Sequence, residues 1–184
     1  MQPLRLFIAL ELPPDLQQLL LSSFKKLPLH PNVYRLTPRD QLHLTVKFLG
    51  DTPVTDLPAL TSVLDSFDGE PAPTIRVERG MLLPPGRPRA AVITAVPDPS
   101  LLDLQARIDS VLSEEGLSQP ERRRFRPHIT VARLKEATEP EDQQILAAWS
   151  PTSDSYPLLT MTLFQSELLP TGPRYTPLEQ IALS

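Results

Sequence analysis

The chain of 184 residues contains no cysteine, and only 3 histidines and 6 glycines are present. Without cysteine, disulfides, thiol nucleophiles and zinc–thiolate sites are excluded. No apolar run approaches the roughly 20 residues that a membrane span requires. The apolar start, residues 6–10, is followed at once by Glu11 and lacks a small-residue cleavage site, so it predicts a strand rather than a signal peptide. We therefore expect a cytoplasmic protein that does not bind membranes.

An excess of positive charge is also absent. The 18 lysines and arginines are outnumbered by 22 acidic residues, for a net charge of −4, so any contact with nucleic acid must be local. Proline is abundant at 23 residues, and together with 40% apolar residues it favours a folded chain with rigid loops over a disordered one. The length predicts one domain, or two small lobes that share a core, and we expect a monomer.

Two short segments share one pattern: His-Leu-Thr-Val begins at His43, and His-Ile-Thr-Val begins at His128. The β-branched and apolar residues in both are typical of a strand, in which residues two positions apart face the same side. His43 therefore shares a face with Thr45, and His128 shares one with Thr130, while the residues between them point into a core. We expect two imidazoles and two hydroxyls on exposed strand faces.

This set of groups fits chemistry at a phosphodiester. An in-line displacement at phosphorus needs a base beside the attacking oxygen and an acid beside the leaving oxygen. Imidazole, with a reference pKa of about 6.5, can serve as either near neutral pH. The threonine hydroxyls can donate hydrogen bonds to the phosphoryl oxygens, where charge builds up. A metal site is the weaker interpretation, because no third ligand has a suitable spacing and hydroxyls are poor zinc ligands.

The chain also repeats itself. The two motif histidines are 85 positions apart, and so are Leu16 and Leu101 in two predicted helices. Pro13 and Pro97, which end the preceding strands, are 84 apart, and Leu-Leu-Pro-Pro-Gly at residues 82–86 returns 86 positions later as Leu-Leu-Pro-Thr-Gly. These four features recur in the same order at nearly the same spacing, which indicates an internal duplication, with repeats at roughly 1–86 and 87–184, rather than a coincidence of two generic patterns. Two copies predict two lobes related by a pseudo-two-fold axis, with a cleft between them.

The periodicity of apolar residues predicts a single α+β domain over residues 1–184, with an antiparallel sheet backed by helices in each lobe. The expected strands are 5–10, 33–36, 42–49, 74–83, 89–96, a second motif strand around 128–131, 158–169 and 175–183. The expected helices are 16–27, 58–67, 101–112 and 140–149, with Ser100 as the N-cap of the third.

Basic residues next to the motifs are candidates for phosphate binding. Lys47 has the strand parity of the first motif, and Arg126 has that of the second if its strand begins so early. The adjacent arginines at 122–124 are equally well explained as a solvated loop or as contacts to nucleic-acid phosphates. The third histidine, His30, lies between prolines without a partner of the same pattern, and we interpret it as a surface residue.

Three aromatic residues, Tyr34, Phe125 and Tyr175, are candidates for stacking on a nucleobase, and each is equally well explained by packing. Phe48 has the parity of the buried motif residues, so we assign it to the core. Trp149 lies in a predicted helix far from either motif, and we assign it to the core as well.

The motifs resemble a known family. Leu-His-Leu-Thr-Val-Lys-Phe-Leu-Gly at 42–50 and Pro-His-Ile-Thr-Val-Ala-Arg at 127–133 are similar to the paired signatures of the two-histidine (2H) phosphoesterases. Within them the chain is most similar to the prokaryotic RNA 2',3'-cyclic phosphodiesterases, also called 2'-5' RNA ligases. The segments 5–10, 163–168 and 175–178 also fit, so the resemblance covers the full length.

The resemblance implies a bilobal α+β fold with a central cleft, no metal and no nucleotide cofactor. It also implies that His43 is the general acid and His128 the general base. The paired motifs are specific to the superfamily and less so to the substrate.

The expected function is that of a metal-independent phosphodiesterase that opens 2',3'-cyclic phosphates at RNA 3' ends or on nucleotides, leaving a 2'-phosphomonoester. The alternatives are cleavage of 2'-5'-linked oligonucleotides, or an RNA- or nucleotide-binding module without turnover. The two histidines of the motifs argue against a binding module without turnover, because binding alone does not need two groups that titrate near neutral pH. No glycine-rich phosphate loop is present, so any RNA joining is expected to be the reversal of cyclic-phosphate opening.

Overall fold

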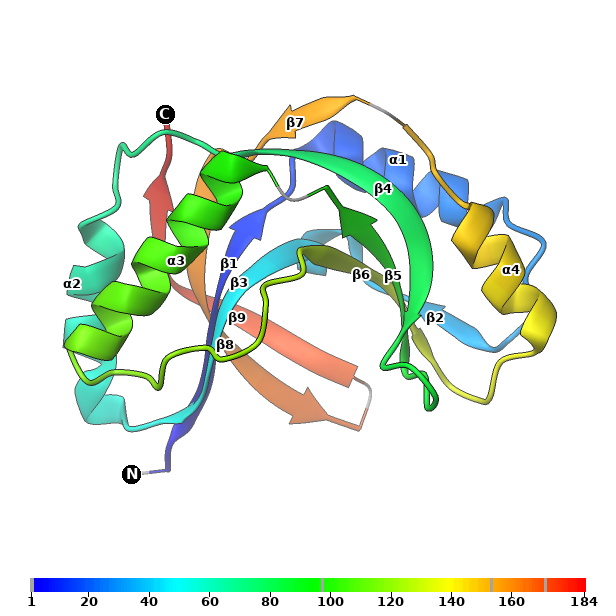
Figure 1. Ribbon diagram of the computed structural model, residues 1–184. Helices are drawn as coiled ribbons and strands as arrows, with labels where there is room; N and C mark the ends of the chain where they lie inside the picture. The colour runs from blue at the N-terminus through cyan, green and yellow to red at the C-terminus, as the bar shows by residue number, and fades with distance from the viewer. Residues whose placement is uncertain (1, 97, 153, 171) are drawn as a thin grey trace.

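The computed structural model describes residues 2–96, 98–152, 154–170 and 172–184, whose nine strands form one antiparallel sheet (Figure 1). The spatial order is β7-β4-β5-β6-β3-β1-β8-β9, with β2 paired to β6. The elements are β1 (Leu4–Glu11), α1 (Pro14–Lys25), β2 (Tyr34–Leu36), η1 (Arg39–Gln41), β3 (His43–Thr52), η2 (Val54–Asp56), α2 (Leu57–Asp65), β4 (Thr74–Leu83), β5 (Ala90–Ala95), α3 (Pro99–Glu114), β6 (His128–Leu134), α4 (Pro140–Ala148), β7 (Ser155–Pro157), β8 (Thr160–Leu169) and β9 (Gly172–Ala182).

The expected helices and strands are all present, with ends shifted by a few residues. Two differences stand out: the short edge strand β7 was not predicted, and β9 begins at Gly172 rather than at residue 175. Pro97, a landmark of the predicted repeat, and Thr171, in the predicted β8–β9 turn, lie outside the described residues.

The two halves of the sheet do not coincide with the two predicted repeats. The order β1-α1-β3-α2-β4 is followed along the chain by β5-α3-β6-α4-β8, but β4 pairs with β5, and β8 pairs with β1. The β7–β6 half of the sheet therefore contains β2 and β4 from the first half of the sequence, and the β3–β9 half contains β8 and β9 from the second. In Figure 1 the sheet bends into an arch. Helices α1 and α4 cover the outer side of the half with β4, β5 and β6, and helices α2 and α3 cover the outer side of the half with β3, β1, β8 and β9.

Every α-helix in the described residues has a proline at its first or second position, which accounts for part of the high proline content. Pro14, Pro58, Pro99 and Pro140 each occupy the first turn, where a missing N–H breaks no hydrogen bond and the fixed φ angle suits the helix. The N-cap of α3 is Asp98, whose carboxylate accepts the Ser100 N–H at 2.9 Å, so the prediction of Ser100 as N-cap is wrong by two residues.

One apolar cluster joins the sheet to all four helices in the described part of the chain. Trp149 is buried at the end of α4, as expected, and its Nε1–H donates to Ser23 Oγ at 3.1 Å. Gly80 of β4 lies so close to α4 that a Cβ there would stand 2.5 Å from the Leu146 carbonyl oxygen. Only glycine allows this contact without a backbone shift.

No helix within the described residues is long and apolar enough to cross a membrane.

Candidate active site

The two motif strands meet at one pair of residues and then diverge. Leu44 of β3 pairs with Ile129 of β6, and the described residues form no second pair between these strands. Both side chains are completely buried, so the residues before and after them face the other side of the sheet. The antiparallel register sets each motif histidine across from the threonine of the other strand.

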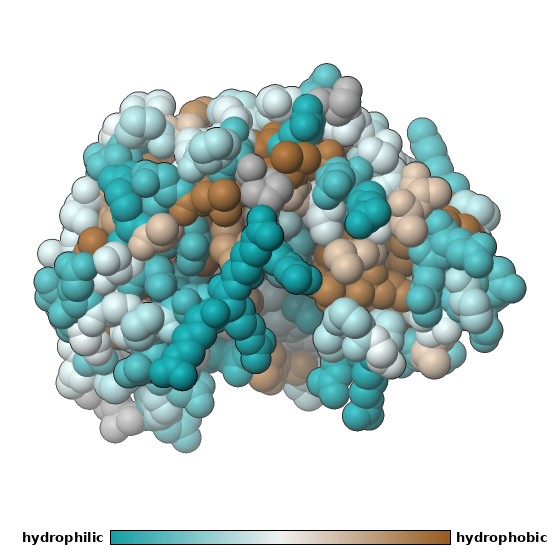
Figure 2. Space-filling model, viewed as in Figure 1, coloured by the Kyte–Doolittle hydropathy of each residue, from teal (hydrophilic) through white to brown (hydrophobic). Residues whose placement is uncertain are grey.

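The four motif side chains, His43, Thr45, His128 and Thr130, line a cleft of about 720 Å³. Its walls come from β1, β2, β3, β6 and the β8–β9 hairpin. The face of the molecule shown in Figure 2 is hollowed at its lower centre, between the two sides of the arch. The structure thus brings the two imidazoles and two hydroxyls of the sequence motifs together in one cavity.

Each motif histidine is held by a main-chain carbonyl two residues before it. His43 Nδ1 lies 2.7 Å from the Gln41 carbonyl oxygen, and His128 Nδ1 lies 2.8 Å from that of Arg126. A carbonyl can only accept, so each Nδ1 carries a hydrogen and donates it. The other nitrogen of each ring, Nε2, is left to accept or donate a proton in the cleft.

Aromatic rings enclose His43 but not His128. The centroids of the Phe7 and Tyr175 rings lie 5.0 and 5.3 Å from that of the His43 imidazole, whereas no ring in the described part of the chain packs on His128. Burial lowers the pKa of His43 from 6.5 to about 4, and the positive charges of Arg133 and His128 act in the same direction. In the unliganded protein His43 is therefore neutral at pH 7.

The cleft is lined by cations and by no anion within the described residues. Its basic side chains come from four different strands: Arg5 of β1, Arg35 of β2, Arg133 of β6 and Arg174 of β9. None of the 22 acidic residues of this net-negative chain is among the lining residues. The field in the cleft therefore attracts anions, although the protein as a whole does not.

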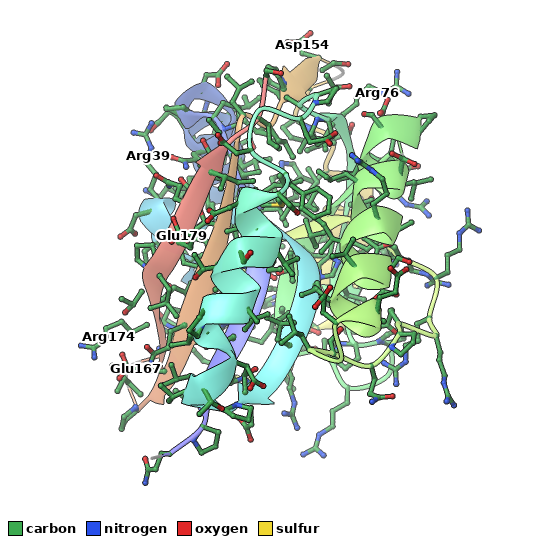
Figure 3. All side chains as sticks on the ribbon, turned by 90° about the vertical axis from the view of Figure 1, so that its left-hand side faces the viewer. Arg39, Arg76, Asp154, Glu167, Arg174 and Glu179 are labelled. Atoms are coloured by element: carbon green, nitrogen blue, oxygen red, sulfur yellow. The ribbon has the colours of Figure 1, made fainter. Side chains whose placement is uncertain are left out.

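One of these arginines belongs to the β8–β9 hairpin, and a second packs against it. Arg174 is held by two hydrogen bonds to Glu167 across the hairpin, at 2.6 and 2.9 Å, and the two side chains lie beside each other in Figure 3. The Arg35 guanidinium packs on Gly172, where a Cβ would stand only 2.8 Å from Nη2 and where φ is +121°. Glycine at this position lets β2 and the hairpin approach each other across the cleft.

A bulge at the same place in both motif strands reverses the side-chain alternation. Val46 of β3 has no partner residue on β1, and Val131 of β6, 85 positions later, has none on β5. Because a bulge adds one residue to one strand, the parity that holds for the motif fails after it. The second residue after each bulged valine lines the cleft: Phe48 from β3 and Arg133 from β6.

The prediction that Lys47 binds phosphate in the cleft is wrong. The bulge turns Lys47 to the opposite face, where its side chain is only 6% exposed. Its ammonium group pairs with the Asp109 carboxylate of α3 and donates to the Gln119 carbonyl oxygen at 2.8 Å. Lys47 therefore connects the first motif strand to the segment that leads into the second.

The parity argument for Arg126 also fails, because β6 begins at His128 and not before it. The Arg126 side chain is exposed and is not among the residues that line the cleft. What Arg126 supplies instead is its carbonyl oxygen, which accepts the hydrogen bond from the His128 imidazole.

Of the three candidates for base stacking, only Tyr175 lines the cleft. The Tyr34 hydroxyl donates to Asp142 at 2.9 Å, its ring packs edge-on against Phe24, and it does not line the cleft that holds His43 and His128. Phe125 packs against the apolar core. For Tyr34 and Phe125 the structure therefore favours packing over stacking.

One further sequence interpretation needs correction. Phe48 is not a core residue but is 67% exposed at the cleft. His30 is a surface residue, as expected, with its side chain 47% exposed. Its Nδ1 lies 2.9 Å from Oδ1 of the completely buried Asp142, and this hydrogen bond raises the pKa of His30. The His30 main-chain N–H donates to the same oxygen at 3.1 Å, so the pair fastens the loop after α1 to α4.

The arginines of the cleft were missed by sequence reasoning. Arg133 has the parity of the core residues in its motif, and only knowledge of the bulge at Val131 would have placed it in the cleft. Arg5 and Arg174 stand in strands with no chemical motif, so their sequence neighbours carry no signal.

No group of three or more His, Cys, Asp or Glu side chains within the described ranges is placed to hold a metal ion.

A family model described as the 2'-5' RNA ligase superfamily matches residues 12–164. The chain belongs to this superfamily. A curated RNA 2',3'-cyclic phosphodiesterase from Thermus thermophilus is 32% identical to it, over 98% of this chain and 90% of the relative. Another of the same name from Escherichia coli is 30% identical, over 100% of this chain and 98% of the relative. The family expected from the two motifs is confirmed.

Solved structures of the superfamily have the same fold. TT0787 of Thermus thermophilus superposes with a TM-score of 0.75 at 30% identity, covering 97% of both chains. Escherichia coli LigT in its apo form gives 0.74 at 29% identity, covering 100% of this chain and 99% of LigT, and LigT has also been crystallised with 3'-AMP. The α+β fold expected from the sequence is therefore confirmed.

Proposed function

We propose that this protein is an RNA 2',3'-cyclic phosphodiesterase, which hydrolyses the cyclic phosphate to a 2'-phosphomonoester by general acid–base catalysis. The observation that carries the proposal is the matched pair of histidines. Both use Nδ1 to donate to a main-chain carbonyl, and both therefore keep Nε2 for proton transfer in one cleft. The curated relatives of that name support the choice of substrate.

The reaction is an in-line displacement. One imidazole takes a proton from water as its oxygen bonds to phosphorus, and the other gives a proton to the ribose 3' oxygen as its bond to phosphorus breaks. The hydroxyls of Thr45 and Thr130 donate to the non-bridging oxygens, where negative charge increases in the transition state. The surrounding arginines hold an anionic substrate in a cleft that has no carboxylate among its described lining residues.

The order of the two roles follows from the family resemblance, with His43 as acid and His128 as base. The pKa of about 4 belongs to His43 in the unliganded cleft. A phosphate anion beside the ring raises this pKa, because it stabilises the imidazolium. We therefore propose that His43 acquires its proton as the substrate binds, in the same event that fills the cleft.

We also propose that the reaction needs no metal and no nucleotide cofactor. The groups around the two histidines are hydroxyls and guanidinium groups, which are poor metal ligands, and both Nδ1 atoms are already engaged.

The decisive experiment is product analysis with the purified protein, a 2',3'-cyclic mononucleotide and excess EDTA. Phosphorus NMR should show a single product, the 2'-phosphomonoester, because the fixed axis between the histidines admits only one ester oxygen to the acid. A 3'-phosphate product, or an absence of turnover, contradicts the proposed activity. Loss of turnover in EDTA that one divalent ion restores contradicts the metal-free mechanism alone.

A further inference from the structure

Glu11, the last residue of β1, is the cross-strand partner of His43 in β3. The preceding pair is Leu10 and Leu44, and both of these side chains are completely buried on the core side of the sheet. Side chains alternate along both strands, and directly opposed residues share a face. Glu11 and His43 therefore leave the sheet together on the side that holds the cleft.

Neutral groups from two further strands hold the Glu11 carboxylate. Its Oε1 accepts the hydroxyl of Thr162 in β8 at 2.6 Å and the side-chain amide of Gln180 in β9 at 2.7 Å. Thr162 is completely buried. A hydroxyl contact of this length is typical of a donor to a charged carboxylate. The carboxylate of Glu11 is thus held in one place by hydrogen bonds that leave its charge intact.

No cation neutralises Glu11 among the described residues. Its side chain is partly buried and takes part in none of the ion pairs there. Glu11 also does not line the cleft, so it is not placed to contact a substrate. The ionisable residue directly opposite it is His43. An unpaired carboxylate near an imidazole stabilises the protonated form of the ring.

The groups around His43 act on its proton in opposite directions. Burial has the largest effect on the pKa of His43 and lowers it, and the positive charges of Arg133 and His128 in β6 also lower it. The main-chain carbonyl bonded to Nδ1 raises this pKa, and so does the charge of Glu11. The Tyr175 phenol of β9 also packs on the ring. Glu11 is the one carboxylate among these groups, and it opposes the two cations.

We propose that Glu11 is a positioning residue for proton transfer, which acts through His43 and stabilises the protonated imidazole that the leaving oxygen requires. The inference rests on the proposed function, in which His43 is the general acid. The substrate phosphate also stabilises the imidazolium, but only while it is bound, whereas the charge of Glu11 is always present. Because Glu11 lies outside the cleft, it can favour a proton on His43 without occupying the site where an anion binds.

The first test measures the His43 proton directly and needs no turnover. Sulfate at saturating concentration replaces the substrate phosphate, because it is a dianion that does not titrate near neutral pH. In NMR titrations the pKa of His43 should be lower in Glu11→Gln than in the wild type, by about half a unit to one unit. Glu11→Asp keeps the charge and should retain most of the wild-type value.

Glu179→Gln is the matched control for this titration. Glu179 is the neighbour of Gln180 in β9, but its cross-strand partner is Leu163 in the core, so it faces the other side of the sheet. Its replacement removes an equal charge and should leave the pKa of His43 unchanged. The same pKa of His43 in Glu11→Gln and in the wild type overturns the proposal.

The second test is the pH dependence of kcat for a 2',3'-cyclic nucleotide. The alkaline limb reports loss of the acid's proton in the enzyme–substrate complex, so Glu11→Gln should move this limb to lower pH. Above the limb kcat should fall about threefold to tenfold, which corresponds to a shift of half a unit to one unit. KM should change little, because Glu11 does not line the cleft. A shift of the acidic limb instead connects Glu11 with the base and contradicts the proposal.

Two comparisons separate action through His43 from a general disturbance of the site. With an activated aryl phosphodiester, whose phenolate leaves without a proton, kcat of Glu11→Gln should stay within about twofold of the wild type. Glu11→Gln combined with His43→Ala should be no slower than His43→Ala alone, because the carboxylate then has no imidazole to act on. Equal losses with both substrates, or additive losses in the double variant, contradict the proposal.

Failure of the proposed function is distinguishable from failure of this inference. If the wild-type protein turns over no cyclic nucleotide, the activity is wrong, and the titration in sulfate still decides the role of Glu11. A lower pKa of His43 in Glu11→Gln then supports the action of Glu11 on His43, and an unchanged pKa overturns it. If the wild type is active and the pKa of His43 does not respond to Glu11→Gln, only the inference about Glu11 is wrong.

Discussion

Replacement of Lys47 by methionine decides whether this residue binds substrate or holds the fold. Its ammonium group is 6% exposed and bonded to both Asp109 and the Gln119 carbonyl. Removal of one partner from a buried ion pair typically destabilises a protein by about 3–5 kcal/mol. Asp109 is 17% exposed and still accepts the Glu121 N–H at 3.0 Å, so we expect the lower end, about 3 kcal/mol.

For a domain of this size, each kcal/mol lowers Tm by about 2–4 °C, so the variant should melt about 6–12 °C below the wild type. Urea unfolding and calorimetry measure the change, while KM for a cyclic nucleotide should stay within about threefold. Lys135→Met is the matched control, since Lys135 is exposed and has no ion pair among the described residues. Exchange of both partners, Lys47→Met with Asp109→Leu, should recover part of the loss, because no unpaired charge remains. A Tm within about 1 °C of wild type, together with a tenfold rise in KM, would refute the buried-anchor interpretation.

Four further predictions concern the catalytic pair and its surroundings. His43→Ala and His128→Ala should each lower kcat by about 10²–10⁴, and the double variant should be little worse than either, because the two act as a unit; substantial turnover in a single variant argues against the assignment. With an activated aryl phosphodiester, whose leaving group needs no proton, His43→Ala should recover more activity than His128→Ala, and the opposite result reverses the two roles. The pKa of His43 is about 4 in the folded protein and about 6.5 in the unfolded chain, so the unfolded chain binds a proton that the folded protein does not, and the free energy of unfolding falls by up to about 3 kcal/mol as the pH decreases from 6.5 to 4. Urea titrations of His43→Gln should lack this part of the loss. Identical pH profiles of the variant and the wild type would show that His43 is not buried as described. Arg133→Gln should reduce kcat/KM well below that of Arg126→Gln, since only Arg133 lines the cleft, and equal effects would mean that Arg126 reaches the substrate after all.

The local chemistry of the site could be predicted from the sequence because it depends on strand geometry alone. His43 and Thr45 share a face in any extended strand, as do His128 and Thr130, and the apolar residues between them must be buried. The offset of 85 positions placed the two strands in equivalent roles, and the paired motifs were sufficient to identify the superfamily. These inferences need no knowledge of which strand pairs with which.

Everything beyond the motifs depended on strand pairing, which no short segment encodes. The bulge at Val46 forms only because β3 has one residue more than β1 over that stretch. It turns the Phe48 side chain toward the cleft and the Lys47 side chain toward Asp109. The exchange of β4 and β8 between the halves of the sheet depends likewise on contacts between residues far apart in the chain.

The electrostatics of the site are also a tertiary property. The low pKa of His43 arises chiefly from burial, and the rings that pack on its imidazole come from Phe7 of β1 and Tyr175 of β9, elements that the sequence separates by more than half its length. The absence of carboxylates from a cleft in a net-negative chain is set by which strands form its walls. The sequence by itself determined which groups perform the chemistry, through the two-residue period of a strand. Only the tertiary structure decided their surroundings, because desolvation and charge act through space rather than along the chain.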